Sequence, residues 1–233
     1  MRKKILKTAY KGKYLDHPSS AKNFIPEWYK KSEQFIGGKV EVFPQSGINR
    51  GPKLCVPFLD ALTSGYIATL WQDIIVSYEF GEPVIRWEEF HDSPKPAQDR
   101  NPITSPTFPI PAGHFNKHFV WQSPYIFKVP KGYSLIVTHP FNRFELPFTT
   151  LSAVVDADGV MAAGNIPFYL KDGFEGVIEK GTPLFQVFPF KREDWKTEED
   201  MSLIENSNRN ISMSSRVVRG WYKNNQWSKK TYE

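Results

Sequence analysis

A polar strip in the second half of the chain, Thr138-His139-Pro140-Phe141-Asn142-Arg143, carries side chains suited to holding a small anion. Arg143 offers a planar guanidinium that can grip a phosphate or carboxylate through two hydrogen bonds. His139 offers an imidazole that titrates near neutral pH. The structural alternative is an arginine paired with an internal acid and a histidine that caps a strand. The sequence predicts that His139, Asn142 and Arg143 contact a small anionic or nucleotide-like ligand.

Two aspartates in the following segment, Asp156 and Asp158, are the second candidate for chemistry. Alternate residues of a strand point to the same side, so the two carboxylates would lie close together and the pKa of one would rise. Such a pair could act as a general base or bind a divalent cation. Asp-Ala-Asp-Gly is also ordinary turn chemistry, and this structural interpretation is the favoured one.

Two histidines four residues apart, His114 and His118, are the candidate metal ligands. On a helix or in a cupin-like barrel, such a pair could ligate a metal if His139 or Glu145 supplied a third ligand. The His-x-His pattern of cupins is missing, which favours two half-exposed loop histidines. The sequence therefore predicts no metal, with a cupin-like metal-dependent enzyme as an alternative.

The strip and the aspartates lie in a stretch, residues 124–192, that reads as a compact β-unit. Its short apolar runs are rich in Val, Ile, Phe and Tyr, and they alternate with Pro-Lys-Gly, Lys-Asp-Gly and Glu-Lys-Gly turn signals. The fold class is therefore predicted to be mainly β and antiparallel, with a barrel-like core as one possibility and a few short helices.

Three segments of the β-unit share an order with a known fold. They are Val129-Pro130-Lys131-Gly132-Tyr133, Val154-Val155-Asp156-Ala157-Asp158 and Lys180-Gly181-Thr182-Pro183-Leu184-Phe185-Gln186-Val187. In this order they resemble the β-clip fold of dUTP pyrophosphatases and dCTP deaminases. The resemblance implies a β-clip-like core, with a pocket at the strip that Asp156, Asp158 and Gln186 help to line.

The chain also departs from that family at two places. The phosphate-gripping Arg-Ser-Gly of the pyrophosphatases is replaced by the polar strip, and Gly159 stands where a tyrosine closes the sugar pocket. These departures argue against dUTP hydrolysis. The sequence favours a protein that is not an enzyme, and it indicates no particular cofactor. The whole chain is also similar to an uncharacterised family of bacterial and phage proteins with Pro-Glu-Trp-Tyr, Cys-x-Pro-Phe and Thr-His-Pro motifs.

Outside the β-unit, the sequence predicts short elements and long loops. A helix is expected over residues 21–35, with Asn23 as its cap and Pro26 in its first turn. Further helices are expected over 56–63 and 193–205, and strands over 39–43, 66–71, 74–80 and 83–87, the last two as a hairpin. Six prolines make residues 91–111 irregular, and Cys55 is expected to be a buried small residue.

The charge of the chain is concentrated at its two ends. Residues 1–15 carry six basic groups and no acid, and residues 216–233 carry five basic groups and one acid. The formal net charge of +5 therefore leaves −5 for residues 16–215. A nucleic-acid groove usually spreads basic residues over a folded face, so this pattern argues against a nucleic-acid partner.

The expected organisation is one β-rich domain over 1–205 with an N-terminal helical extension, followed by a segment over 206–233. That segment comprises a polar linker and a basic-aromatic tail, which is expected to dock on the body or on a partner. Four large aromatic residues in the tail could stack on bases, but they are too apolar for a solvated tail, which favours docking.

Cysteine usage and hydropathy bound the environment. Cys55 is the single cysteine, which excludes an intrachain disulfide and fits a reducing cytoplasm, that of the host if the protein is phage-encoded. The most apolar long stretch, residues 55–78, is interrupted by Asp60, Gln72 and Asp73, so neither a membrane span nor a signal peptide is expected.

Two function classes follow: a pocket protein for a small anionic ligand, or a structural or interaction protein that forms a homo-oligomer or binds a protein partner.

Overall fold

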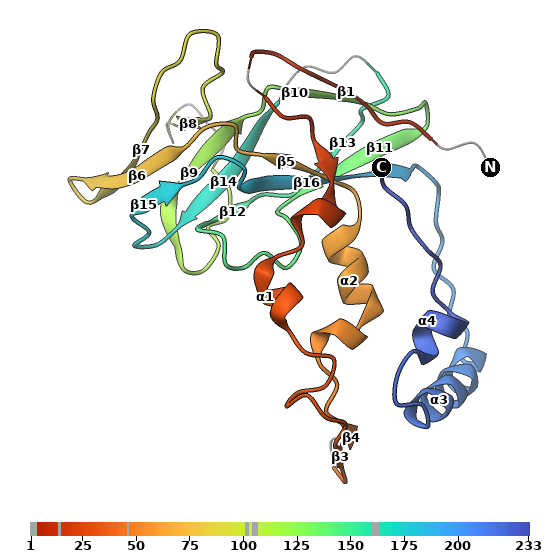
Figure 1. The fold of residues 1–233 in the computed structure, drawn as a ribbon. Helices are drawn as coiled ribbons and strands as arrows, with labels where there is room; N and C mark the ends of the chain where they lie inside the picture. The colour runs from red at the N-terminus through yellow and green to blue at the C-terminus, as the bar shows by residue number, and fades with distance from the viewer. Residues whose placement is uncertain (1–3, 14, 46, 101–102, 104–106, 160–163) are drawn as a thin grey trace. The chain divides into compact units, whose positions relative to one another are not determined.

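The computed structural model of the chain describes residues 4–13, 15–45, 47–100, 103, 107–159 and 164–233 (Figure 1). The chain divides into two compact units, and both are discontinuous in sequence. The first, here called the β unit, comprises residues 1–21, 65–192 and 233. The second, called the helix-rich unit, comprises residues 22–64 and 193–232.

The described residues of the β unit form four antiparallel sheets. The largest has the order β13–β11–β16–β5–β2, with bounds Ala153–Val155, Tyr133–Thr138, Pro183–Lys191, Tyr66–Thr69 and Ser19–Ser20. A second has the order β12–β14–β9–β8, with bounds Phe148–Thr150, Asn165–Lys171, His114–Gln122 and Ala97–Asp99. The third is β15–β6–β7, with bounds Gly176–Ile178, Ile74–Glu79 and Glu82–Arg86. The fourth pairs β1, Lys7–Tyr10, with β10, Tyr125–Lys128.

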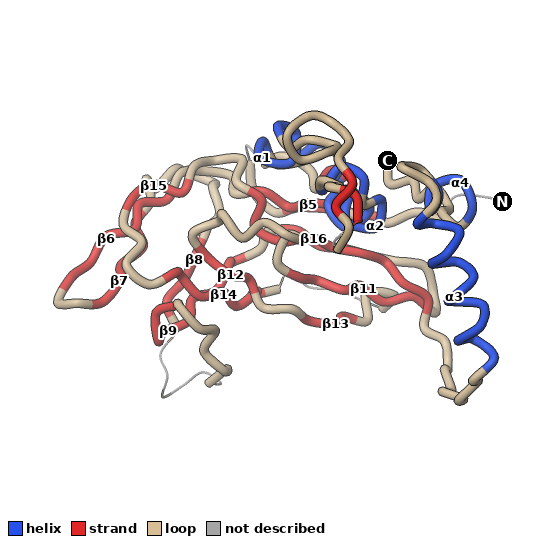
Figure 2. The backbone as a smooth tube through the Cα atoms, turned by 90° about the horizontal axis from the view of Figure 1, so that it is seen from below, coloured by secondary structure: helices blue, strands red, loops and turns tan. Residues whose placement is uncertain are grey.

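This architecture confirms the predicted fold class, which is mainly antiparallel β with short helices. Figure 2 shows β11 and β16 running side by side, and six residues of β11 pair with β16 in one continuous register. The strand orders are open across the part of the chain that the structure describes, so no sheet closes into the barrel-like core that was expected.

The core of the β unit is aromatic. The Trp121 ring stacks on Phe168 with ring centroids 3.6 Å apart, and Phe148 meets Trp121 edge to face at 5.0 Å. Trp121 Nε1 donates to Thr150 Oγ1 at 3.1 Å, and the Thr150 hydroxyl donates to the Leu184 carbonyl at 2.7 Å. The indole N–H of Trp121 and the hydroxyl of Thr150 are therefore both hydrogen-bonded within this core, as burial requires.

The predicted hairpin of the β unit forms between β6 and β7. Its turn residues, Phe80 and Gly81, have φ values of 53° and 82°. Two consecutive left-handed residues are typical of the type I′ turn, which matches the twist of a two-stranded ribbon. An ion pair between Arg86 and Glu79 links the two strands of the ribbon.

The helix-rich unit contains short helices and one small ribbon. The helices are α1 at Glu27–Lys31, α2 at Val56–Thr63, α3 at Ser202–Ser215 and α4 at Trp221–Asn225. Strand β3, Val42–Phe43, pairs with β4, Gly47–Ile48. Two 3-10 turns, η1 at Ala21–Phe24 and η2 at Pro52–Leu54, precede α1 and α2.

The first helix prediction was wrong in its extent. Residues 21–35 form η1 and then α1, because Pro26 lacks an N–H and disfavours a helical residue before it. Pro26 is itself the N-cap residue of α1, so Asn23 is not the cap. The strand expected over 39–43 shrinks to Val42–Phe43. The helix over 56–63 is confirmed.

The C-terminal helix lies later in the sequence than predicted. Residues 193–200 are not helical, and the segment expected as a polar linker is part of α3. The Asp200 carboxylate, just before the N-cap residue Met201, accepts a hydrogen bond from the amide of Ser202, the first residue of α3, at 2.9 Å. Near the other end, the hydroxyls of Ser214 and Ser215 donate to the carbonyls of Ile211 and Ser212, so these serines satisfy their polar groups within the helix.

Three further expectations can be compared with the structure. The expectation that Cys55 is buried was wrong. Cys55 is exposed, and it lies between η2 and α2, at the N-cap position of α2. The irregular segment 91–111 contains the short strand β8, which pairs with β9, while its residues 101–102 and 104–106 lie outside the described residues. The domain boundary expected at residue 205 falls inside α3. Residues 193–232 instead belong to the same compact unit as residues 22–64.

No helix in the described ranges has the length and apolar character needed to cross a bilayer.

Candidate functional site

The polar strip forms the loop between β11 and β12, and its histidine is held on both ring nitrogens. His139 Nδ1 accepts a hydrogen bond from the Thr150 amide at 3.3 Å, so the proton resides on Nε2, which donates to the Arg143 carbonyl at 3.1 Å. Burial lowers the pKa of His139, with the backbone hydrogen bond to Arg143 opposing it. The geometry therefore favours a neutral His139 that closes the loop.

Gln186 fixes the same loop from the neighbouring strand. It lies opposite Thr138 in the β11–β16 register and is almost fully buried, and its Oε1 accepts a hydrogen bond from the Phe141 amide at 2.8 Å. The Phe141 ring stacks on Phe188 with ring centroids 5.0 Å apart. Asn142 then takes a left-handed conformation, with φ of 57°, which turns the chain.

Arg143 forms an ion pair with Glu145, and its side chain is only 14% exposed. The structural alternative considered from the sequence, an arginine paired with an internal acid, describes this contact. The structure brings His139, Asn142, Arg143 and Gln186 into one cluster, in which His139 bonds to the Arg143 carbonyl and Gln186 to the Phe141 amide.

Asp156 and Asp158 lie in a second cluster, at the opposite end of β11. Asp156 Oδ1 accepts a hydrogen bond from Ser134 Oγ at 2.5 Å and lies 3.1 Å from Arg192 Nη1. Asp158 accepts from the Gly132 amide at 2.9 Å and forms an ion pair with Arg192. The two clusters therefore do not make a single site.

The expectation of a raised pKa at one aspartate was wrong. The pKa of Asp156 is lowered, first by its hydrogen bond to Ser134 and then by Arg192. The pKa of Asp158 is lowered by Arg192 and by the Gly132 amide. Bonds to the charged form outweigh the repulsion between the two carboxylates, so neither is prepared to act as a base.

The sequence analysis missed Arg192, which organises the second cluster. Its amide donates to the Gly132 carbonyl at 2.9 Å. Arg192 and Gly132 directly adjoin the Tyr133–Lys191 pair at the end of the β11–β16 register. No local signal marks this residue. Only the pairing of two strands that are 50 residues apart places it beside the aspartates.

The two candidate metal ligands lie on one strand, β9, instead of a helix. Four residues along a strand span about 13 Å, which is too far for two side chains to share one ion. His114 Nε2 is 2.8 Å from Thr149 Oγ1 and Nδ1 is 3.0 Å from the Ala112 carbonyl. His118 is buried beside Phe108 and Tyr169, and burial lowers its pKa.

No group of three or more metal-ligating side chains occurs in the ranges that the structure describes.

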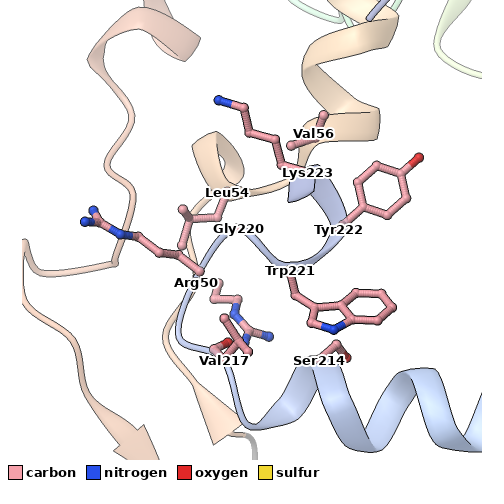
Figure 3. Close-up of a pocket in the computed structure, with 10 residues that line it drawn as sticks. Arg50, Leu54, Val56, Ser214, Val217, Gly220, Trp221, Tyr222 and Lys223 are labelled. Carbon is pink, nitrogen blue, oxygen red and sulfur yellow. The ribbon is translucent and has the colours of Figure 1, made fainter. Parts of the chain in front are cut away.

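Two cavities differ in charge. A cleft of about 540 Å³ beside the strip is lined by Glu145, Asp172 and Glu179, with Lys171 as its one cation among the described lining residues. A smaller cavity of about 140 Å³ lies within the helix-rich unit (Figure 3). Its charged lining residues are Arg50, Arg219 and Lys223. The charged residues described in the cleft lining are thus mostly acidic, whereas those in the lining of the smaller cavity are basic.

Segment 216–233 contacts α2 through one carboxylate. Asp60 Oδ2 accepts hydrogen bonds from Trp227 Nε1 at 2.9 Å and from Lys230 Nζ at 2.6 Å. Arg50 donates from Nη2 to the Val217 carbonyl at 2.9 Å. The two sequence segments of the helix-rich unit are therefore joined by polar contacts to charged groups.

Comparison of the chain with models of protein families, with curated proteins and with solved structures gave no match. The resemblance to the β-clip fold stays a prediction.

Proposed function

We propose that this chain is a structural protein without catalytic activity, which assembles with a second copy of itself through helix α3. The observation that carries the proposal is the surface of this helix. None of its fourteen residues is buried, although four of them are large and apolar. Leu203 and Ile211 are 60% and 62% exposed, and Ile204 and Met213 are also exposed.

Such a helix needs a partner for physical reasons. An isolated helix of this length is marginal in water, and most helical stability in proteins comes from packing an apolar face. In α3 the residues Leu203, Ser207 and Ile211 lie at i, i+4 and i+8, so they share one face. A protein that packs on this face would bury two large aliphatic side chains.

A second copy fits this face well. In an antiparallel pair of α3 helices, with a two-fold axis next to Ser207, Leu203 of each copy lies opposite Ile211 of the other. Serine at the axis is small enough for the helices to approach closely. Glu205 and Arg209 are the two charged residues of the helix, and they cancel, so two copies meet without net repulsion.

A small anionic or nucleotide-like ligand near Thr138–Arg143 has less support. His139 and Gln186 are engaged with the backbone of the loop, and Arg143 is paired with Glu145. A cupin-like metal-dependent enzyme has the least support, because His114 and His118 are far apart on one strand.

Sedimentation velocity over a range of protein concentrations tests the assembly. The wild-type chain is expected to form a dimer, and Ile211→Asp is expected to sediment as a monomer with an unchanged circular dichroism spectrum. Ser212→Asp is the matched control, since it adds the same charge to another face of α3 and leaves the dimer intact. A wild-type chain that stays monomeric at every concentration contradicts the proposal, as does an equal effect of the two variants.

A further inference from the structure

The smaller cavity, within the helix-rich unit, is enclosed by two segments that are far apart in sequence. Residues 50–56 supply Arg50, Leu54 and Val56, and residues 214–223 supply Ser214, Val217, Arg219, Gly220, Trp221, Tyr222 and Lys223. Figure 3 shows Trp221 beside Ser214 of α3, and Lys223 on the side of Leu54 and Val56. The cavity thus combines an apolar wall, two aromatic rings and cationic side chains.

The charge of this lining is of one sign. Arg50, Arg219 and Lys223 are cations, and no Asp or Glu is among the described residues that line the cavity. Asp60, on the helix that contributes Val56, accepts hydrogen bonds from Lys230 and Trp227. Three positive charges around about 140 Å³ therefore attract an anion, and no carboxylate among the described lining residues opposes it.

Arg50 is fixed in place before any ligand arrives. Its Nη2 donates to the Val217 carbonyl at 2.9 Å and its Nε donates to the Val218 carbonyl at 3.4 Å. A guanidinium has five N–H donors, and these two bonds use two of them, so three donors remain for other partners. Because the side chain is already ordered, binding loses less conformational entropy at this residue.

The opposite wall is also held by polar contacts. The Asn225 side chain donates to the Trp221 carbonyl at 2.7 Å, and the amides of Gln226 and Trp227 donate to the Tyr222 carbonyl at 2.9 and 3.0 Å. Trp227 is in turn bonded to Asp60 on α2, the helix that contributes Val56. The residues that carry Trp221, Tyr222 and Lys223 are thus anchored to the other side of the cavity.

We infer that this cavity is a binding site for a phosphate group on a small molecule. Two arginines and a lysine match the charge of a dianion better than that of a single carboxylate, and arginine binds phosphate oxygens in pairs. The volume suits one phosphate group with few atoms attached. Leu54, Val217 and the ring of Trp221 offer an apolar surface for whatever carries the phosphate.

Isothermal titration calorimetry with inorganic phosphate, at ionic strength held constant with chloride, tests the site. The wild-type chain is expected to bind one phosphate per chain saturably, and acetate is expected to bind more weakly. Lys223→Gln and Arg219→Gln each remove one cation from an exposed position, and each is expected to weaken phosphate binding about tenfold.

Lys229→Gln is the matched control, because Lys229 lies in the same segment but outside the cavity lining. It is expected to bind phosphate as tightly as the wild type. The inference is overturned if phosphate does not saturate, if acetate binds equally well, or if Lys223→Gln and Lys229→Gln weaken binding alike. Melting temperatures of the three variants, recorded without phosphate, are expected to match the wild type.

Discussion

The two units of this chain bury their apolar side chains to different extents. The β unit has a continuous core in which Trp121, Phe148 and Phe168 are almost wholly buried. Within the described residues of the helix-rich unit, the buried large apolar side chains are Tyr29, Phe35 and Leu62. The β unit is therefore stabilised mainly by hydrophobic burial. The helix-rich unit depends more on individual hydrogen bonds made by Asp60 and Arg50.

The largest expected effect is on the free energy of unfolding, and it is tested by replacing one tryptophan in each unit. Trp121→Ala is expected to lower the free energy of unfolding by about 3–5 kcal/mol, because it leaves a cavity in the aromatic core. Trp195→Ala is the control, since that side chain is 88% exposed in the helix-rich unit, and its unfolding is expected to match the wild type. Urea denaturation measures both, and similar losses in the two variants would contradict the comparison.

A smaller effect is expected where the helix-rich unit relies on one carboxylate. Asp60→Ala removes the acceptor shared by Trp227 and Lys230, and losing a hydrogen bond to a charged group costs about 1.5–3 kcal/mol. Trypsin is expected to cleave the native variant faster after Lys229 and Lys230, while the β unit unfolds as in the wild type. Asp194→Ala serves as the control, and an unchanged cleavage rate in Asp60→Ala would show that the segment is held by other contacts.

The smallest effect concerns the dependence of the β unit on pH. The folded pKa of His139 lies below its ordinary value of 6.5, so the unfolded chain takes up the proton first as pH falls below 6.5. Stability is then lost with decreasing pH until the folded pKa is reached, by at most about 1.4 kcal/mol per pH unit for one proton. His118, whose pKa is also lowered, adds to this slope.

His139→Asn is expected to lower stability at pH 7 and to reduce its decrease between pH 7 and pH 5. The measurement is urea denaturation at several pH values. His91→Asn is the control, because the His91 side chain is 97% exposed. If the slope is the same in His139→Asn and the wild type, the buried histidine of the strip is not the titrating group.

The fold of the β unit could be predicted from sequence because its signals are local. Turn residues separate apolar runs of strand length, and the Phe80–Gly81 turn of the β6–β7 hairpin lies within one residue of its predicted position. Helix boundaries were harder. Pro26 divided one predicted helix, and α3 formed over Ser and Asn residues of modest helix propensity, where composition indicated a linker.

The candidate site was less predictable because its chemistry depends on distant partners. The types of Arg143, His139 and Asp156 suggested ligand binding, but the contacts made by Glu145, Thr150 and Arg192 decide what these groups do. Arg192 reaches Asp156 only through the pairing of β11 with β16. Residue types and spacing cannot reveal which polar groups will satisfy one another after folding.

The discontinuity of the two units has a consequence for the order in which the protein is made. Residues 22–64 leave the ribosome before β5, and they must wait for 128 intervening residues before the segment 193–232 that completes their unit is synthesised. The β unit is complete once β16 has emerged, so it can fold while the helix-rich unit is still unfinished. During that interval Asp60 of α2 lacks its partners Trp227 and Lys230. The exposed residues around α2 are then accessible to chaperones.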